Sequence, residues 1–409
     1  MLNLDEKIRS LTALGIELNQ VHDLDILMEH ILSKARHFVS ADAGSIYIKE
    51  GDLLNFTYTQ NKTLQDRVPG HQKLIYSTFS IPIDESSLSG YVASTGDYLN
   101  IPDVYTLDKS LPYKFSKIFD VASDYRTQSI LTLPLKNTRG DIIGILQIIN
   151  SQDDKGNIRA FSENDEEIMF HFASVAAVAL QRARMTRAMI LRMIKMAELR
   201  DPKETGAHVN RVAGYSVELY ERWARKHCVP VEEINYNRDI LRMAAMLHDV
   251  GKVATSDLIL KKPGKLTEEE FEIMKEHTLH GSRIFINMES EYEEVASIVA
   301  SNHHEKWDGS GYPGHVDMFS GEPDEKFLQP DGRIPGKRGE EIPLFGRIVA
   351  LADVFDALSS ARVYKKAWKE EDVLALIKKD SGTHFDPELV EIFFEALDVL
   401  RSIQARYKS

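Results

Sequence analysis

The spacing of hydrophobic residues changes along the chain and predicts two domains. In the first 180 residues, apolar runs of strand length alternate with turn residues, which predicts an antiparallel sheet flanked by helices. One pair of runs surrounds residues 137–141, whose Asn, Gly and Asp are typical of a hairpin turn. The predicted strands lie at residues 44–48, 53–58, 130–135 and 142–149, after a helical segment at 26–39.

A long helix is predicted to follow this first domain. No Pro or Gly occurs between Asp165 and Arg200, and apolar residues recur every three or four positions until a polar interruption near Thr186. Such a seam indicates a partner helix, and we favour a parallel homodimer over the alternative of one helix packed on its own domain. The seam consists of Ile168, Phe172, Val175, Ala179, Ala183, Ile190, Met193 and Ala197.

Length and composition restrict the class of protein. A chain of 409 residues is long for one core, so two domains are expected. The single cysteine, Cys228, excludes a disulfide framework and suits a reducing cytosol. No apolar stretch approaches the roughly 18 residues of a membrane span, and the first five residues lack the basic start of a secretory signal, so we expect a cytoplasmic protein. A net charge of −13 argues against binding of nucleic-acid polymers.

Candidate chemistry begins where the apolar helix 240–247 ends in His248 and Asp249. A buried, ionised carboxylate is costly unless a cation pairs with it, and a divalent metal would do so directly. The alternative is an ordinary helix end, in which His248 caps carbonyls and Asp249 pairs with Lys252. For these two residues alone the two interpretations are balanced.

More imidazoles and carboxylates occur where a solvated charge would be costly. Most of them lie at predicted helix ends or on apolar helix faces, and a metal cluster explains the whole set better than several unrelated core residues. The set contains no thiolate, which favours iron or manganese over structural zinc. Its members are Glu204, His208, His248, Asp249, His277, His303, His304 and Asp353.

The second half of the chain resembles a known family. Residues 248–252 (HDVGK), 303–305 (HHE), 308–313 (DGSGYP) and 383–387 (THFDP) together resemble the HD-GYP subgroup of the HD superfamily of metal-dependent phosphohydrolases. The resemblance covers roughly residues 197–400. It implies an all-α HD-type catalytic domain over residues 201–409, joined to the first domain (1–180) by the long helix (165–200).

The resemblance also implies roles for individual residues. A binuclear core would use His248, Asp249, His277, His303, His304 and Asp353, with Asp249 bridging the metals, while Glu204 and His208 would hold a third metal. The cofactor would thus be two or three divalent ions, iron above all and manganese as the alternative. Lys252 and Tyr312 would contact substrate, and Arg362 and Lys365 would hold its second phosphate. Asp356 would orient a metal ligand instead of binding metal itself.

The implied activity is hydrolysis of cyclic di-GMP to pGpG, with Asp249 and Lys252 as catalytic residues, and further cleavage to GMP stays open. A mixed cyclic GMP-AMP dinucleotide stays open as the substrate. Two other interpretations are a cyclic-dinucleotide sensor with little turnover and a hydrolase of ppGpp or a nucleotide monoester. A contact with a diguanylate cyclase through the Gly-Tyr-Pro loop is also compatible with the resemblance.

The first half resembles a GAF sensory domain. The resemblance rests on residues 89–93, 99–103, 125–131 and 134–135, and it implies an unknown small ligand that regulates the second domain. Residues 119–120 and 125–127 are similar to cyclic-nucleotide-binding members. The alternative is that Phe119 packs in the core while Arg126 caps or pairs at the sheet edge.

One segment departs from the family pattern. Residues 315–338 separate the Gly-Tyr-Pro loop from the Gly-Glu-Glu-Ile-Pro step at 339–343 and contain several Pro and Gly residues. A loop of this length in a compact domain is often a lid, so the segment could close over the substrate or block it.

Overall fold

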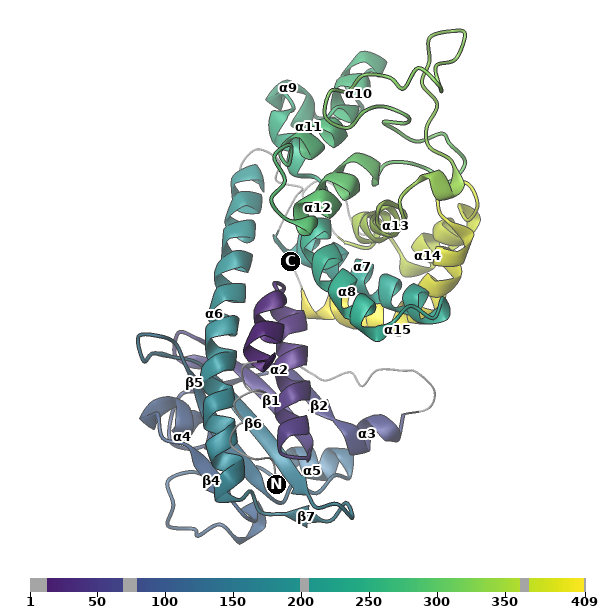
Figure 1. The fold of residues 1–409 in the computed structure, drawn as a ribbon. Helices are drawn as coiled ribbons and strands as arrows, with labels where there is room; N and C mark the ends of the chain where they lie inside the picture. Colours follow the sequence, from purple (N-terminus) through teal and green to yellow (C-terminus); the bar gives the residue numbers. More distant parts are fainter. Residues whose placement is uncertain (1–12, 69–78, 199–205, 361–367, 408–409) are drawn as a thin grey trace. The chain divides into compact units, whose positions relative to one another are not determined.

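The computed structural model describes residues 13–68, 79–198, 206–360 and 368–407 (Figure 1). The chain forms two compact units, Met1–Arg187 and Ala188–Ser409. Among the described residues, no helix combines the length and the apolar character that crossing a membrane requires.

The first unit is built on an antiparallel sheet with strand order β3-β2-β1-β6-β5-β4, in which β7 pairs with β6 (Figure 1). The two longest strands, β1 and β6, lie at its centre. The sequence prediction of an antiparallel sheet flanked by helices is therefore confirmed. The strands are β1 (Ala41–Glu50), β2 (Leu53–Asn61), β3 (Ser80–Pro82), β4 (Leu99–Ile101), β5 (Ile130–Lys136), β6 (Ile142–Gln152) and β7 (Ile158–Arg159).

Helices α2 (Leu24–Phe38) and α6 (Glu163–Glu198) contribute to one apolar core with β1, β5 and β6. Gly44 of β1 allows a close approach there, because a Cβ atom would lie 2.8 Å from Leu32 Cδ1 of α2 and 2.9 Å from Gln147 O. A second core includes residues of α4 (Leu88–Thr95) and of the three-residue turn η1 (Val104–Thr106). The shorter helices are α3 (Lys62–Asp66) and α5 (Ile118–Ser123).

The burial of α6 corrects the prediction that its apolar seam faces a partner helix of a second chain. Phe172, Ala179 and Ala183 are fully buried in the unit's own core, so these positions are not available to a second chain. Small alanine side chains let the helix lie close to the sheet, and the periodicity alone did not tell which surface covers it. The exposed apolar side chains of α6 within the first unit are instead Phe170, Val178 and Met185.

The residues that resemble cyclic-nucleotide-binding GAF members also differ from one expectation. Phe119 is largely exposed and stacks on Phe79 with 5.2 Å between ring centroids, so the alternative interpretation that it packs in the core is wrong. The guanidinium of Arg126 lies over the Tyr105 ring and 3.5 Å from Asp103 Oδ2, so Arg126 does pair with a neighbouring carboxylate.

In the described residues of the second unit, the regular elements are helices, apart from isolated bridges, and this confirms the predicted fold class. Helix α7 is almost entirely buried and packs against α8, α13 and α15. A capping box formed by Thr267 and Glu270 is present at the start of α10. The helices are α7 (Gly206–Lys226), α8 (Val231–Met246), α9 (Asp257–Leu260), α10 (Glu268–Lys275), α11 (His277–Arg283), α12 (Glu291–Asn302), α13 (Leu344–Ser359), α14 (Glu370–Lys379) and α15 (Pro387–Arg406), with 3-10 turns η2 (Val250–Ala254) and η3 (Gly339–Glu341).

Residues 315–338 form an irregular loop, as the sequence indicates. The buried carboxylate of Glu305 holds the two ends of this loop together. Its Oε1 accepts a hydrogen bond from Gly314 N at 2.6 Å, and its Oε2 accepts one from Lys337 N at 3.0 Å. Arg283 of α11 holds the first part of the loop through the carbonyls of residues 319 and 320, at 2.6 and 2.7 Å. Arg283 follows His277 by six residues, about 240° around the helix, so this part of the loop packs away from the His277 face.

Candidate metal centre

The end of α8 turns an imidazole and a carboxylate into the interior. The helix stops at Met246, and the turn that follows buries both His248 and Asp249. His248 Nδ1 lies 2.8 Å from Ala245 O. A carbonyl oxygen can only accept, so Nδ1 carries the proton and Nε2 presents its lone pair to the site.

The same arrangement recurs on two other helices. His277, at the start of α11, places Nδ1 2.6 Å from Met274 O, and His303, at the end of α12, places Nδ1 3.0 Å from Ala300 O. In each case a carbonyl of the preceding turn fixes the tautomer and the direction of the ring. Such a second contact is the usual support of a metal-binding histidine.

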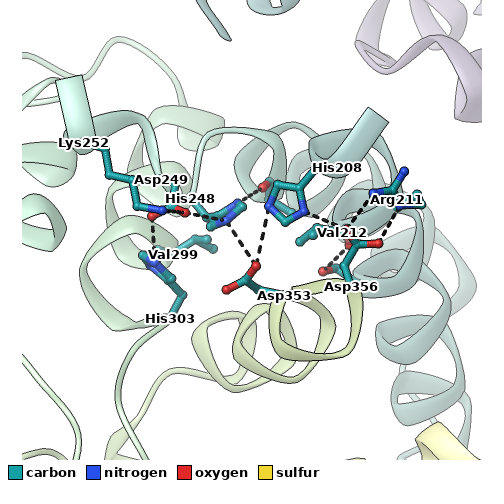
Figure 2. Close-up of polar contacts among 12 residues, drawn as sticks. His208, Arg211, Val212, His248, Asp249, Lys252, Val299, His303, Asp353 and Asp356 are labelled. Carbon is teal, nitrogen blue, oxygen red and sulfur yellow. Dashed lines mark hydrogen bonds and ion pairs between the residues drawn. The ribbon is translucent and has the colours of Figure 1, made fainter. Parts of the chain in front are cut away.

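The side chains form two groups whose potential ligand atoms lie within 4.8 Å of one another: Asp249, His277, His303 and His304 in one, and His208, His248 and Asp353 in the other. Asp249 joins the groups, because its Oδ1 lies 3.2 Å from His277 Nε2. Its Oδ2 lies 3.3 Å from His248 Nε2 (Figure 2). Six predicted core ligands are thus brought together, and Asp249 has the place expected of a bridge.

His208 lies in the second group. The sequence paired it with Glu204 at a third metal, whereas its Nε2 lies 3.5 Å from Asp353 Oδ1 in the second group. Glu204, Arg362 and Lys365 lie outside the described residues. The predicted third metal therefore stays a prediction.

The chemistry of these donors fits divalent cations. Among the described residues, the buried atoms His277 Nε2, His303 Nε2 and Asp249 Oδ1 have no hydrogen-bond partner. Each unsatisfied buried polar atom costs about 1–3 kcal/mol, and a bound cation would remove that cost. The set consists of imidazole nitrogens and carboxylate oxygens, which divalent metal ions accept as ligands.

Electrostatics keep the donors in the protonation states that a metal requires. Burial alone would raise the pKa of Asp249, but Lys252 and His248 outweigh it and hold that pKa well below its usual value. Burial, reinforced by His303, lowers the pKa of His304 well below the usual value, and burial also lowers the pKa of His303. The carboxylate is therefore ionised and these imidazoles are neutral at neutral pH.

A buried ion pair behind the second group orients His208. Asp356 Oδ2 lies 2.8 Å from His208 Nδ1, and Arg211 binds both oxygens of Asp356, with Nε at 2.6 Å and Nη2 at 2.9 Å (Figure 2). Asp356 thus lies where a residue that orients a metal ligand was expected, beside His208. The sequence analysis missed Arg211, although its position three residues after His208 on a helix places it beside that ligand.

Lys252 and Tyr312 adjoin the cluster. Lys252 Nζ lies 2.6 Å from Asp249 Oδ2, so the helix-end contacts considered as an alternative are present together with the ligand groups. Tyr312 stacks on His304 with 4.9 Å between ring centroids, and the base of its loop is held by Glu305. The sequence assigned no role to Glu305 beyond its place in the 303–305 motif, because its contacts are with backbone that only the fold brings near.

Known families match both units. Residues 205–358 match the HD domain family, residues 328–389 match a second HD domain model, and residues 23–180 match the GAF domain family. A cyclic di-GMP phosphodiesterase of Vibrio cholerae is 40% identical over 224 residues, which cover 54% of this chain and 41% of that protein.

Two further relatives have related names. A 3'3'-cGAMP-specific phosphodiesterase 2 of Vibrio cholerae is 40% identical over 203 residues, covering 50% of this chain and 33% of that protein. A cyclic di-GMP phosphodiesterase of Thermotoga maritima is 38% identical over 220 residues, covering 54% of this chain and 52% of that protein. The chain thus spans between a third and about half of the length of these three relatives.

Proposed function

Because this chain joins a GAF domain to an HD domain, we propose that it is a metal-dependent phosphodiesterase that hydrolyses cyclic di-GMP to pGpG under the control of its GAF domain. The observation that carries the proposal is the position of Asp249 between two groups of metal-ligand side chains. A relative with a cGAMP-specific name makes the mixed dinucleotide the second candidate substrate.

Each group would hold one divalent ion, iron in our proposal and manganese as the alternative. Two bound cations would polarise the phosphoryl oxygens and lower the pKa of an attacking water. Asp249 would keep the ions adjacent, and Lys252 would neutralise charge at the scissile phosphate from its place beside Asp249. Displacement of a ribose 3′-oxygen from phosphorus would then open the ring and leave a 5′-phosphate.

The direct test combines metal and product analysis. Protein purified without oxygen is analysed for bound metals and then incubated with cyclic di-GMP or 3′3′-cGAMP, and the products are separated by chromatography. We expect at least two iron ions per chain and accumulation of pGpG. A metal-loaded protein that binds cyclic di-GMP and leaves it intact would contradict an enzyme and support the sensor interpretation.

Lys252 and Arg362 can separate a cyclic-dinucleotide hydrolase from a general metal phosphodiesterase. Arg362, assigned by resemblance, would hold the phosphate that is not on the metals, and such a charge-assisted contact contributes about 1.5–3 kcal/mol. In Arg362→Ala, the kcat/KM ratio of cyclic di-GMP to a small aryl phosphodiester is expected to fall about tenfold to a hundredfold. Lys252→Ala is expected to lower both kcat/KM values.

A matched control is Arg333→Ala, which removes an exposed guanidinium from the 315–338 loop. It is expected to leave both kcat/KM values near those of the wild type. An equal loss for the two substrates in Arg362→Ala would mean that this residue supports the fold and does not bind the second phosphate.

We also propose that the exposed face of α6 forms the homodimer contact. Phe170, Val178 and Met185 lie on this face, whereas nearby arginines are directed elsewhere: Arg182 donates to Val21 O at 2.8 Å, and Arg187 pairs with Asp25 at 3.0 Å. Identical helices could therefore meet along these apolar side chains without facing the guanidinium groups of Arg182 and Arg187. The second chain would occupy this stripe instead of the seam inferred from the sequence.

Disulfide cross-linking tests the proposed dimer. In a Cys228→Ser background, Val178→Cys is expected to give a rapid, nearly complete disulfide-linked dimer under mild oxidation, detected by non-reducing electrophoresis. Lys155→Cys, an exposed position in the β6–β7 turn, is the control and should stay largely monomeric. Equal cross-linking at both positions, or a monomer in light-scattering measurements, would contradict the proposal.

A further inference from the structure

A row of aromatic rings leads from the metal centre to the protein surface. His304 is stacked on Tyr312, and the edge of Tyr312 meets Phe271 of α10 with 6.1 Å between ring centroids. Phe271 is 44% exposed, and no residue of α10 is buried. The outer end of the row is therefore an aromatic surface within reach of a ligand bound at the metals.

A cation lies at this outer end. Lys275 Nζ is 5.1 Å from the centroid of Phe271 and 5.6 Å from that of Tyr312. Its partner Glu272, at 2.7 Å, is itself exposed, and such a pair contributes little to stability. The ammonium group can therefore turn from Glu272 towards a ligand without a large cost.

This combination of groups matches the chemistry of a nucleobase. A base stacks on an exposed aromatic ring whatever its identity, because every base has a π face. A lysine ammonium donates to the O6 and N7 acceptors of guanine, whereas adenine presents an amino donor where guanine has O6. The ring would thus supply affinity and the cation would supply preference for guanine.

We propose that Phe271 and Lys275 form a guanine-binding contact at the rim of the metal centre, in which Phe271 stacks on one base of the dinucleotide and Lys275 donates to its O6 and N7. The proposal rests on the proposed cyclic-dinucleotide hydrolase, since a phosphodiester at the metals brings its attached nucleoside to this rim. It adds a determinant of base specificity to that site.

The test compares affinities for two dinucleotides that differ only in their bases. Phe271→Ala and Lys275→Met are prepared as metal-loaded full-length protein, and Kd and kcat/KM are measured for cyclic di-GMP and cyclic di-AMP. Phe271→Ala is expected to weaken binding of both about fivefold to a hundredfold. Lys275→Met, which keeps most of the aliphatic stem, is expected to reduce the preference for cyclic di-GMP about tenfold.

Ile273 provides the matched control. It lies on the same helix with the same exposed fraction as Phe271, 44%, but about 200° around the helix axis. Ile273→Ala should therefore leave both Kd values unchanged. Equal effects in Ile273→Ala and Phe271→Ala would mean that α10 acts only through the fold, and would overturn the base contact.

The same measurements separate this proposal from the proposed function. Hydrolysis of cyclic di-GMP by the wild type, with unchanged Kd values and unchanged base preference in both variants, would overturn the guanine contact alone. A wild type that binds the dinucleotide without hydrolysing it would contradict the proposed enzyme. The Kd comparison would then still decide whether Phe271 and Lys275 bind the base.

Discussion

Replacing Asp249 with alanine is expected to remove both metal ions and to reduce phosphodiester hydrolysis to the background rate. The carboxylate approaches ligands of both groups through different oxygens, His277 and His303 through Oδ1 and His248 through Oδ2. Without it, each ion would lose an anionic ligand, and no negative charge would lie between the two cations. Metal content is measured by mass spectrometry on protein purified without oxygen.

Two companion variants make this result specific. Asp249→Asn keeps the shape of the side chain but removes its charge, and it should also lose metal. Asp239→Asn alters another buried carboxylate ten residues earlier on α8, and it should keep its metal and its activity. Full metal content with normal turnover in Asp249→Ala would show that these side chains do not form a metal centre.

In the first unit, the sequence predicted where strands and helices lie better than it predicted what they pair with or pack against. The predicted strands at 44–48 and 53–58 lie within β1 and β2, because alternating apolar residues and turn signals are local. The short strands β3, β4 and β7 left no pattern of their own, since two or three residues cannot show a period. Pairing with a longer neighbour in the sheet is what makes them strands.

The long helix shows a different limit of sequence reasoning. Its apolar period was real, and Phe172 and Ala179 are indeed buried. The period indicates that one face of the helix is buried, but it does not indicate whether the same chain or a second chain buries it. Only the structure shows that the buried positions of the predicted seam pack in the core of the same unit. The exposed apolar stripe of the helix lies instead at Val178 and Met185.

The ligands could be found from sequence because most of them occupy helix ends or apolar faces. Their division between two groups could not, because His208 reaches Asp353 through packing of α7 against α13. Arg211 and Glu305 were missed for a related reason. A charged residue is usually solvated, and only the fold shows that these two are buried beside their partners.

The Arg211–Asp356 ion pair that orients His208 should affect the affinity for one metal ion and not for the other. Loss of Asp356 alone would leave the buried guanidinium of Arg211 without its carboxylate, a change that can destabilise a protein by about 3–5 kcal/mol. The double variant Arg211→Gln/Asp356→Asn avoids this, because two amides of similar shape can bond to each other. It keeps the packing and removes both charges.

In this double variant, the affinity for one metal ion is expected to fall about tenfold to a hundredfold, the usual effect of removing a group that orients a ligand. The ion held by Asp249, His277, His303 and His304 should stay bound, so metal titration should change from two strong sites to one strong and one weak site. Glu221→Gln is the control, because it removes a buried carboxylate of α7 that pairs with the buried Arg238 of α8 at 3.3 Å, away from the ligands. This control variant should have a lower melting temperature, while both metal sites stay strong. Equal weakening of both sites in the double variant would show that the Arg211–Asp356 pair supports the fold as a whole instead of orienting His208.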